Sequence, residues 1–110
     1  MNKAEILIID DEPQIRKLLE ITLQSSGYIP RSASSAKEGL IMAGNHPPEM
    51  ILLDIGLPDE NGLVVLQKLR QWYTNPVIIY LFKNRKKLLS RHWIVALMII
   101  YQSHFVRVNC

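Results

Sequence analysis

The stretch that decides the fold is Met50-Ile51-Leu52-Leu53-Asp54-Ile55-Gly56-Leu57-Pro58-Asp59-Glu60-Asn61-Gly62. Four apolar residues lead directly into one carboxylate, and turn-forming residues follow at once. A short apolar run bounded by turn signals is typical of a strand buried on both faces, as in a parallel sheet. Asp54 then lies at the carboxyl end of that strand, where open α/β sheets bind their ligands. The alternative is a carboxylate that merely caps a loop.

Strand-like and helix-like patterns alternate along the first 79 residues. Strands are predicted at 5–9, 28–31, 50–53 and 77–80. Helices are predicted from Pro13 to a cap at Gly27, from Ser34 or Ser35 through Met42, and over 63–73. This alternation predicts a doubly wound parallel α/β sheet. Right-handed crossovers leave few topologies, among them the flavodoxin-like strand order 2-1-3-4-5.

Length and composition favour one globular domain without disulfides. The chain has 110 residues, and its one cysteine, Cys110, is the last of them. The start of the chain lacks the pattern of a signal peptide, so we expect a cytoplasmic location. The charge is divided unevenly. Residues 1–79 hold seven Lys/Arg and ten Asp/Glu, a net charge of −3, whereas residues 80–110 hold six Lys/Arg and no acid, a net charge of +6.

Three carboxylates are expected to converge at one edge of the sheet. Asp10 and Asp11 follow the first strand and Asp54 ends the third, and these two strands are neighbours in the flavodoxin-like order. Three such charges would repel one another, and a hard divalent cation such as Mg²⁺ removes that conflict. A helix N-terminus accounts for one nearby acid but not for three. A carboxylate beside the cation can also act as a nucleophile toward a phosphoryl group, and Asp54 is the candidate because it stands alone on its strand end.

Two separated motifs carry a resemblance to a known family. They are Ile8-Ile9-Asp10-Asp11-Glu12-Pro13 and Leu53-Asp54-Ile55-Gly56-Leu57-Pro58-Asp59-Glu60-Asn61-Gly62. With them, residues 4–79 resemble a bacterial response-regulator receiver domain, whose fold is the chemotaxis-regulator (CheY-like) form of the flavodoxin-like sheet. Two segments resemble OmpR-type regulators of Kdp potassium-transport systems: Gly56-Leu57-Pro58-Asp59 and Leu69-Arg70-Gln71-Trp72.

The resemblance implies specific roles and partners. Asp54 would be the phospho-acceptor, and Mg²⁺ would be bound by the side chains of Asp11 and Asp54 and the carbonyl of Gly56, with Asp10 in support. The chain would act in a phosphorelay and not as an enzyme, with a sensor histidine kinase as partner. Homodimers are expected of an intact transcriptional regulator of this type. No direct DNA binding is expected of this chain. No membrane span is expected either, since the apolar run from Trp93 to Tyr101 is shorter than the ~20 residues that a span needs.

The resemblance stops at about residue 79. A receiver domain would have a Ser or Thr at about position 81, where this chain has Leu81, and a Lys-Pro pair further on, which is absent from the sequence. The run from Trp93 to Tyr101 does not match a receiver's fourth helix and fifth strand, and we expect it to pack irregularly or to expose apolar surface that promotes aggregation. We therefore expect residues 1–79 to be a receiver domain and residues 80–110 an aberrant tail without a DNA-binding output domain.

The genetic code offers an explanation for this tail. If the codons after about Ile79 are read one base earlier, His92-Trp93-Ile94 must become Leu-Asp and Met98-Ile99 must yield another Asp. With permitted codons the segment from residue 92 becomes Leu-Asp-Ser-Gly-Ala-Asp-Asp-Tyr-Leu-Ser-Lys-Pro-Phe-Arg-Ala, which resembles the missing receiver segment. The same shift allows Ile-Leu-Ser in place of Ile79-Tyr80-Leu81. We infer a one-base deletion that impairs switching.

Three other functions stay open on the sequence alone. The first is a stand-alone receiver that works by docking. The second is a metal-dependent phosphatase with Asp54 as nucleophile, although such an enzyme would need a second acid where Gly56 stands. The third is a nucleic-acid-binding protein that uses the basic tail, which would make its binding strongly salt-dependent.

Overall fold

The computed structural model describes residues 3–83 and 94–101. The strands are β1 (Glu5–Ile9), β2 (Ile29–Ala33), β3 (Met50–Asp54), β4 (Val77–Lys83) and β5 (Ile94–Tyr101). The helices among these residues are α1 (Pro13–Ser25), α2 (Ala36–Asn45) and α3 (Gly62–Leu69). The predictions for Cys110 and for most of the basic residues of the 80–110 tail concern residues outside these ranges.

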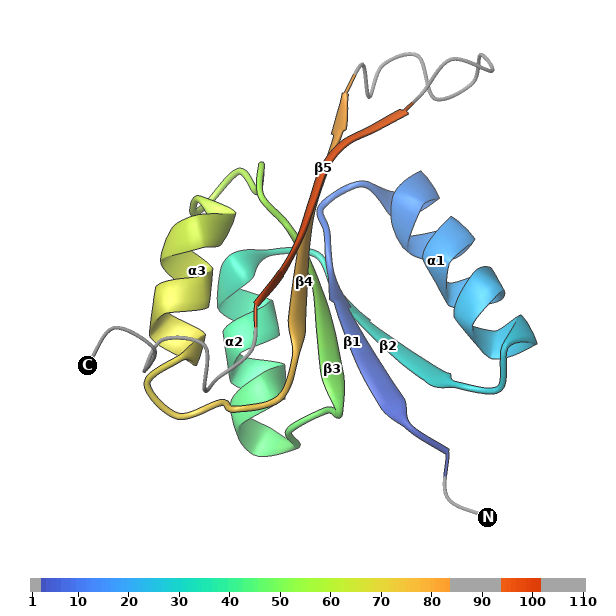
Figure 1. The fold of residues 1–110 in the computed structure, drawn as a ribbon, viewed down its shortest axis with the longest axis horizontal. Helices are drawn as coiled ribbons and strands as arrows, with labels where there is room; N and C mark the ends of the chain where they lie inside the picture. The colour runs from blue at the N-terminus through green and yellow to red at the C-terminus, as the bar shows by residue number, and fades with distance from the viewer. Residues whose placement is uncertain (1–2, 84–93, 102–110) are drawn as a thin grey trace.

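The five strands form one sheet in the order β2-β1-β3-β4-β5, in which the order of the first four, 2-1-3-4, is as predicted. The first four pair in parallel, and β2 forms an edge, as its Pro30 indicates. Helix α1 covers one face of the sheet, whereas α2 and α3 lie side by side on the other (Figure 1). The central strands are therefore buried on both faces, which explains their nearly continuous apolar sequences.

Local sequence signals explain where the helices begin and end. Pro13 stands in the first turn of α1, where its missing N–H breaks no helical bond. The Ser35 side chain accepts a hydrogen bond from the Glu38 N–H, and Glu38 accepts one from the Ser34 N–H, so that α2 starts with a reciprocal cap. Gly27 has a φ of 91° after α1, a conformation that glycine adopts without strain.

Helix α3 ends four residues earlier than predicted, at Leu69 instead of Tyr73. The Arg70 guanidinium donates hydrogen bonds to the carbonyls of Tyr73 and Asn75, which fixes a turn where the helix would have continued. The Tyr73 ring is buried, and its hydroxyl donates to the carbonyl of Pro48 at 2.8 Å. This turn leads the chain directly into β4.

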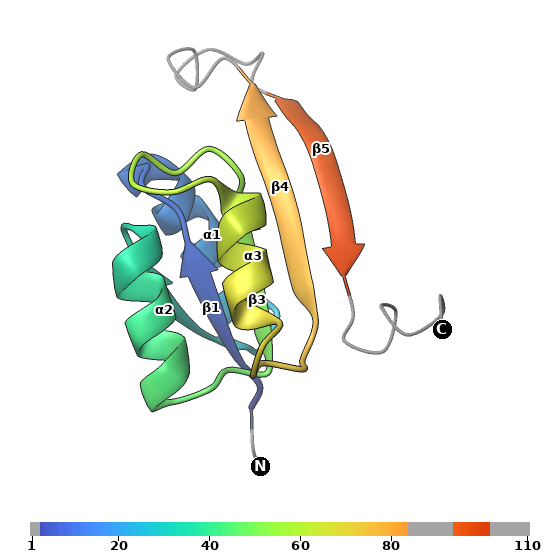
Figure 2. The same cartoon turned by 90° about the vertical axis from the view of Figure 1, so that its left-hand side faces the viewer.

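The last two strands depart from the predicted pattern. Strand β4 continues to Lys83 instead of ending at Tyr80, and β5 pairs with it in antiparallel direction, from Val77↔Tyr101 to Lys83↔Ile94. The pair extends past the ends of the other strands (Figure 2). The expectation that the run up to Tyr101 packs irregularly is thus wrong for Ile94–Tyr101, because apolar residues in regular extended conformation satisfy their backbone groups by pairing with β4. The pairing is nevertheless opposite in direction to that of the other strands.

The hydrophobic core lies mainly between the sheet and α2 and α3. It includes side chains from β1, β3, β4 and both helices, among them Leu7, Ile9, Leu53, Val65 and Ile79. A smaller cluster lies under α1 and joins Ile15 to Tyr80, with Leu19 and Leu52 packed against it. In the part of the chain that the structure describes, no helix has the length and apolar character needed to cross a membrane.

Candidate functional site: an acidic cluster at the carboxyl edge of the sheet

Two neighbouring strands bring three carboxylates together. Asp10 directly follows β1 and Asp54 ends β3, and these strands pair in parallel from Ile6↔Met50 to Ile9↔Leu53. One carboxylate oxygen from each of Asp10, Asp11 and Asp54 lies within 4.8 Å of the others. The predicted convergence is therefore confirmed. Asp10 and Asp54 are fully buried, and Asp11 is half-buried.

Asp10 is held by its backbone and by both of its carboxylate oxygens. Its N–H donates to the Ala33 carbonyl at 3.1 Å, and its own carbonyl accepts a hydrogen bond from Arg16 at 2.8 Å. Its Oδ1 accepts from the Glu12 N–H at 2.8 Å, and its Oδ2 accepts from the Tyr80 hydroxyl at 2.7 Å. Such bonds are needed because an uncompensated buried carboxylate is costly.

Asp54 is oriented by the turn that follows it. Its Oδ1 accepts a hydrogen bond from the Gly56 N–H at 3.1 Å. The Ile55 N–H donates to the Tyr80 carbonyl, which extends the pairing with β4 by one residue. The Asp54 side chain is thus fixed between a regular strand and a short turn, with Gly56 close enough to share a site with it.

The loop between Asp54 and α3 is closed by Gly62. The Gly62 N–H donates to the Ile55 carbonyl at 2.9 Å. A Cβ at position 62 would lie 2.6 Å from the Ile55 Cα and 2.7 Å from the Asp54 carbonyl oxygen, so only glycine fits without a backbone shift. The glycine at this position therefore keeps the first turn of α3 packed against the backbone of the acidic cluster.

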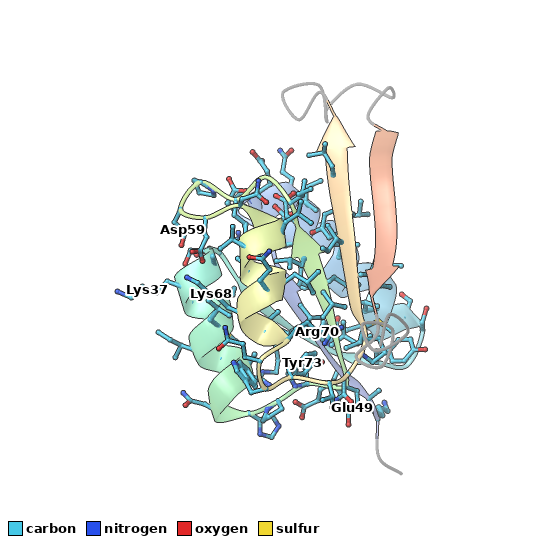
Figure 3. All side chains as sticks on the ribbon, turned by 60° about the vertical axis from the view of Figure 1, so that its left-hand side comes forward. Lys37, Glu49, Asp59, Lys68, Arg70 and Tyr73 are labelled. Atoms are coloured by element: carbon cyan, nitrogen blue, oxygen red, sulfur yellow. The ribbon has the colours of Figure 1, made fainter. Side chains whose placement is uncertain are left out.

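Asp59 ties the same loop to α2. Its carboxylate accepts hydrogen bonds from the N–H groups of Ala36 and Lys37, at 3.0 and 3.1 Å. Figure 3 shows Asp59 beside the first turn of α2, and Tyr73 and Glu49 at the opposite end of the molecule. The bond from Ala36 is the main cause that lowers the pKa of Asp59 below its ordinary value of 3.8.

Residues 80 and 81 both differ from the predicted site: Leu81 lacks the expected hydroxyl, and Tyr80 brings a hydroxyl that was not predicted there. Leu81, where the family resemblance implies a hydroxyl, is half-buried, and its Cδ1 would lie 3.8 Å from a Cβ on Gly56. This position therefore borders the cluster with an apolar side chain. Tyr80 was not predicted as a site residue, but it pairs with Asp54 in the sheet and its hydroxyl reaches Asp10. The strand register could have indicated its proximity, but not its rotamer.

The cluster has the chemistry of a site for a hard cation. Its ligands are carboxylate oxygens, with the Gly56 backbone adjacent, and Mg²⁺ prefers one or two carboxylates, carbonyl oxygens and water. The two buried acids also make extra positive charge favourable at this position. The residues present therefore fit Mg²⁺.

Comparison with known proteins places this geometry in a family. The family model described as the response regulator receiver domain matches residues 6–96. The chain belongs to that family. The match extends beyond residue 79, where the recognised motifs end, so a boundary there is not fixed by the family model.

Individual relatives agree with this receiver-domain assignment. The transcriptional regulatory protein KdpE of Mycobacterium tuberculosis is 49% identical over 74 residues, which are 67% of this chain and 33% of that protein. The chemotaxis response regulator CheY4 of Vibrio cholerae is 27% identical, with a TM-score of 0.68 over 71% of this chain and 68% of that one. The response regulator TrrA of Thermotoga maritima, solved in complex with Mg²⁺-BeF, is 37% identical, with a TM-score of 0.60 over 62% of this chain and 59% of that one.

These similarities confirm the receiver-domain family, the CheY-like fold and the likeness to KdpE. Membership of the receiver-domain family of two-component response regulators is consistent with a role in phosphorelay signalling. The chain spans about a third of the length of the KdpE protein that it matches. Receiver domains generally bind Mg²⁺ at an acidic site, and Asp10, Asp11 and Asp54 form an acidic cluster in this one.

Proposed function

We propose that this receiver domain accepts a phosphoryl group on Asp54 in a Mg²⁺-dependent reaction. The observation that carries the proposal is the convergence of three carboxylate oxygens within 4.8 Å at the carboxyl edge of a CheY-like sheet. Asp54 is the proposed acceptor because it ends its own strand and its carboxylate is oriented through one oxygen by the following turn. Oδ1 is held by the Gly56 N–H, and Oδ2 is the candidate nucleophile.

The transfer follows from the chemistry of a carboxylate. Asp54 Oδ2 forms the new oxygen–phosphorus bond while the bond from phosphorus to a donor histidine nitrogen breaks, and that nitrogen keeps the electron pair. The Gly56 N–H keeps the carboxylate oriented during the attack. The Asp54 side chain is fully buried, so the carboxylate is shielded from bulk water.

Mg²⁺ would be held by the side chains of Asp11 and Asp54 and by the carbonyl of Gly56, with Asp10 in support. When bound, it supplies the positive charge that neutralises the phosphoryl oxygens. The complex of the 37% identical TrrA with Mg²⁺-BeF supports this part of the proposal.

The physiological partner follows from the same reaction. A sensor histidine kinase is the proposed phosphoryl donor, and a cytoplasmic location is proposed with it. The likeness to a transcriptional regulatory protein supports an origin in a transcriptional response regulator. The part of such a regulator that this chain matches is the receiver, so its own role is to accept the phosphoryl group and not to catalyse turnover.

Residues 80–110 are proposed to arise from a one-base deletion near the codon for Ile79. Leu81 at the position of the family hydroxyl, the absent Lys-Pro pair and the antiparallel direction of β5 support this proposal. The nucleotide sequence around codon 79, compared with that of a related gene, tests it directly. A related gene that encodes the same tail in the same frame would contradict it.

Two of the alternative functions have less support than phosphoryl acceptance. A phosphatase of this type would use a second acid two residues after its nucleophile, and Gly56 stands there. Nucleic-acid binding would use basic residues that mostly lie outside the described ranges. A receiver that acts by docking alone would not need to be phosphorylated. The phosphorylation experiment described next therefore separates it from the proposed function.

Intact-mass measurement after incubation with acetyl phosphate tests the proposal. We expect a single added phosphoryl group in the presence of Mg²⁺, and none when EDTA replaces Mg²⁺ or when the variant is Asp54→Asn. Glu49→Gln is the matched control, because Glu49 lies at the opposite end of the sheet (Figure 3) and its loss should leave the reaction unchanged. Equal labelling of Asp54→Asn and the original chain would refute the assignment.

A further inference from the structure

A tyrosine hydroxyl points into the acidic cluster although nothing in the proposed phosphoryl transfer uses it. Tyr80 lies in β4 opposite Asp54, and its hydroxyl donates to Asp10 Oδ2 at 2.7 Å. The Tyr80 side chain is 3% exposed. Ile15, Leu19 and Leu52 pack around it under α1, so the ring has little freedom to turn away from Asp10.

We propose that Tyr80 is an internal competitor of the cation at this site, so that its hydroxyl lowers the affinity of the acidic cluster for Mg²⁺. The inference rests on the proposed Mg²⁺ site. The hydroxyl supplies partial positive charge to one of the three converging carboxylates, which favours the state of the cluster without a bound cation. It therefore stabilises that state by the same kind of interaction that a divalent cation provides.

The two interactions oppose each other because both depend on the negative charge of Asp10. A hydrogen bond to a carboxylate is strong while the carboxylate keeps its full negative charge. It weakens when a nearby cation offsets part of that charge. By linkage, a donor that binds the metal-free state more strongly than the metal-bound state must reduce metal affinity by the corresponding factor.

The opposite role, in which Tyr80 positions Asp10 for the metal, is disfavoured by the other contacts of Asp10. The backbone N–H and carbonyl of Asp10 are anchored to Ala33 and Arg16, and its Oδ1 accepts from the Glu12 N–H. These three contacts come from β2, from α1 and from the residue before α1, and they do not involve Tyr80. The orientation of the carboxylate therefore survives without the hydroxyl, and what changes is the electrostatic compensation of Oδ2.

The test is Mg²⁺ titration of the original chain and of Tyr80→Phe, which removes only the hydroxyl. We expect Tyr80→Phe to bind Mg²⁺ at least about fivefold more tightly, the lower end of usual coupling energies. Tyr73→Phe is the matched control, since it also removes a buried hydroxyl, but one that donates to the Pro48 carbonyl at the other end of the sheet. Its Mg²⁺ affinity should equal that of the original chain.

A spectroscopic readout follows the same bond in the original chain and in both variants. Mg²⁺ should perturb the near-ultraviolet absorbance of a tyrosine in the original chain and in Tyr73→Phe, and this perturbation should be absent from Tyr80→Phe.

Equal or weaker Mg²⁺ binding by Tyr80→Phe, or binding without any tyrosine perturbation in the original chain, would overturn the proposal. If Asp11→Asn loses Mg²⁺ binding in the same series, the site itself stands. No Mg²⁺ binding by the original chain and by Tyr80→Phe would overturn both the site and the role of Tyr80.

Discussion

Asp59 caps the helix that begins at Ala36: its Oδ1 accepts a hydrogen bond of 3.0 Å from the Ala36 N–H across a separation of 23 residues. The same carboxylate accepts a second bond from the Lys37 N–H. A residue of the loop after Asp54 thus satisfies the N-terminus of α2, although Ser35 already provides the local cap. This contact couples the position of the acidic-cluster loop to a neighbouring helix.

Asp59→Ala should lower the free energy of unfolding by about 1 kcal/mol, the usual contribution of a helix cap. Asp59 is exposed, so a larger electrostatic contribution is not expected. Urea unfolding at neutral pH measures the difference, with Asp59→Asn as a control that keeps one acceptor oxygen. If Asp59→Ala and the original chain unfold at the same urea concentration, this capping contact contributes no stability.

The same contact predicts a dependence on acid. Since hydrogen bonds lower the pKa of Asp59 in the folded state, its contribution is present above the unfolded-state pKa and is lost as pH falls through the folded-state pKa. The stability difference between the original chain and Asp59→Ala should therefore be constant at neutral pH and shrink below the ordinary value of 3.8. A difference that grows on acidification would have the wrong sign.

Tyr73 makes the corresponding prediction at high pH. Burial raises its pKa to about 12 from an ordinary value of 10.0. The neutral phenol is thus favoured in the folded state, and its contribution is present below pH 10 and is lost as pH rises toward 12. The stability advantage of the original chain over Tyr73→Phe should decline across this range. Tyrosinate absorbance at each pH checks the titration. In the unfolded state the original chain, with four tyrosines, should ionise one tyrosine more than Tyr73→Phe.

Gly62→Ala should destabilise the fold and disturb the cluster, because the new methyl group would meet the backbone of Asp54 and Ile55. We expect a loss of about 2 kcal/mol, typical of overpacking. Gly44→Ala is the matched control, since a Cβ there has no neighbour within 4 Å and Gly44 lies in α2, where alanine is the better helix former. Thermal unfolding should rank Gly62→Ala below the original chain and Gly44→Ala at or above it.

The sequence predicted the parts of the fold that depend on periodicity and on strand ends. The apolar run before Asp54 and the acids after Ile9 were sufficient to predict neighbouring parallel strands and converging carboxylates, since parallel strands end at one edge. The turn residues around Gly62 also marked the start of α3 correctly to within one residue. These features are local, or they follow from a single topological rule.

The differences between prediction and structure arise from long-range contacts. Helix α3 stops at Leu69 because the Arg70 side chain binds carbonyls further along the chain, which helical periodicity does not reveal. Strand β4 continues past Tyr80 because β5 pairs with it, and the direction of that pairing is not encoded in an apolar run. Tyr80 reaches Asp10, 70 residues away, through a rotamer set by packing under α1.

Restoring one base near codon 79 should restore switching. The restored chain would carry a hydroxyl near position 81 and a Lys-Pro pair, and a lysine contact would bind the phosphoryl group more strongly in one conformation than in the other. With acetyl phosphate and Mg²⁺, the restored chain should show a phosphorylation-dependent change in dimerisation or fluorescence, whereas the original chain should show none even when Asp54 is labelled. An equal response from both chains would mean that the segment after residue 79 supports switching.

Mapping the acyl phosphate is the most direct test of the central claim. After acetyl phosphate and Mg²⁺, reduction with borohydride converts a phosphorylated aspartate to homoserine, which peptide mass spectrometry assigns to a position. We predict homoserine at position 54 and unmodified aspartate at positions 10 and 11, since the Gly56 N–H orients Asp54 while Asp10 is held by Glu12 and Tyr80. Homoserine at position 10 or 11, or at no position despite bound Mg²⁺, would contradict the account.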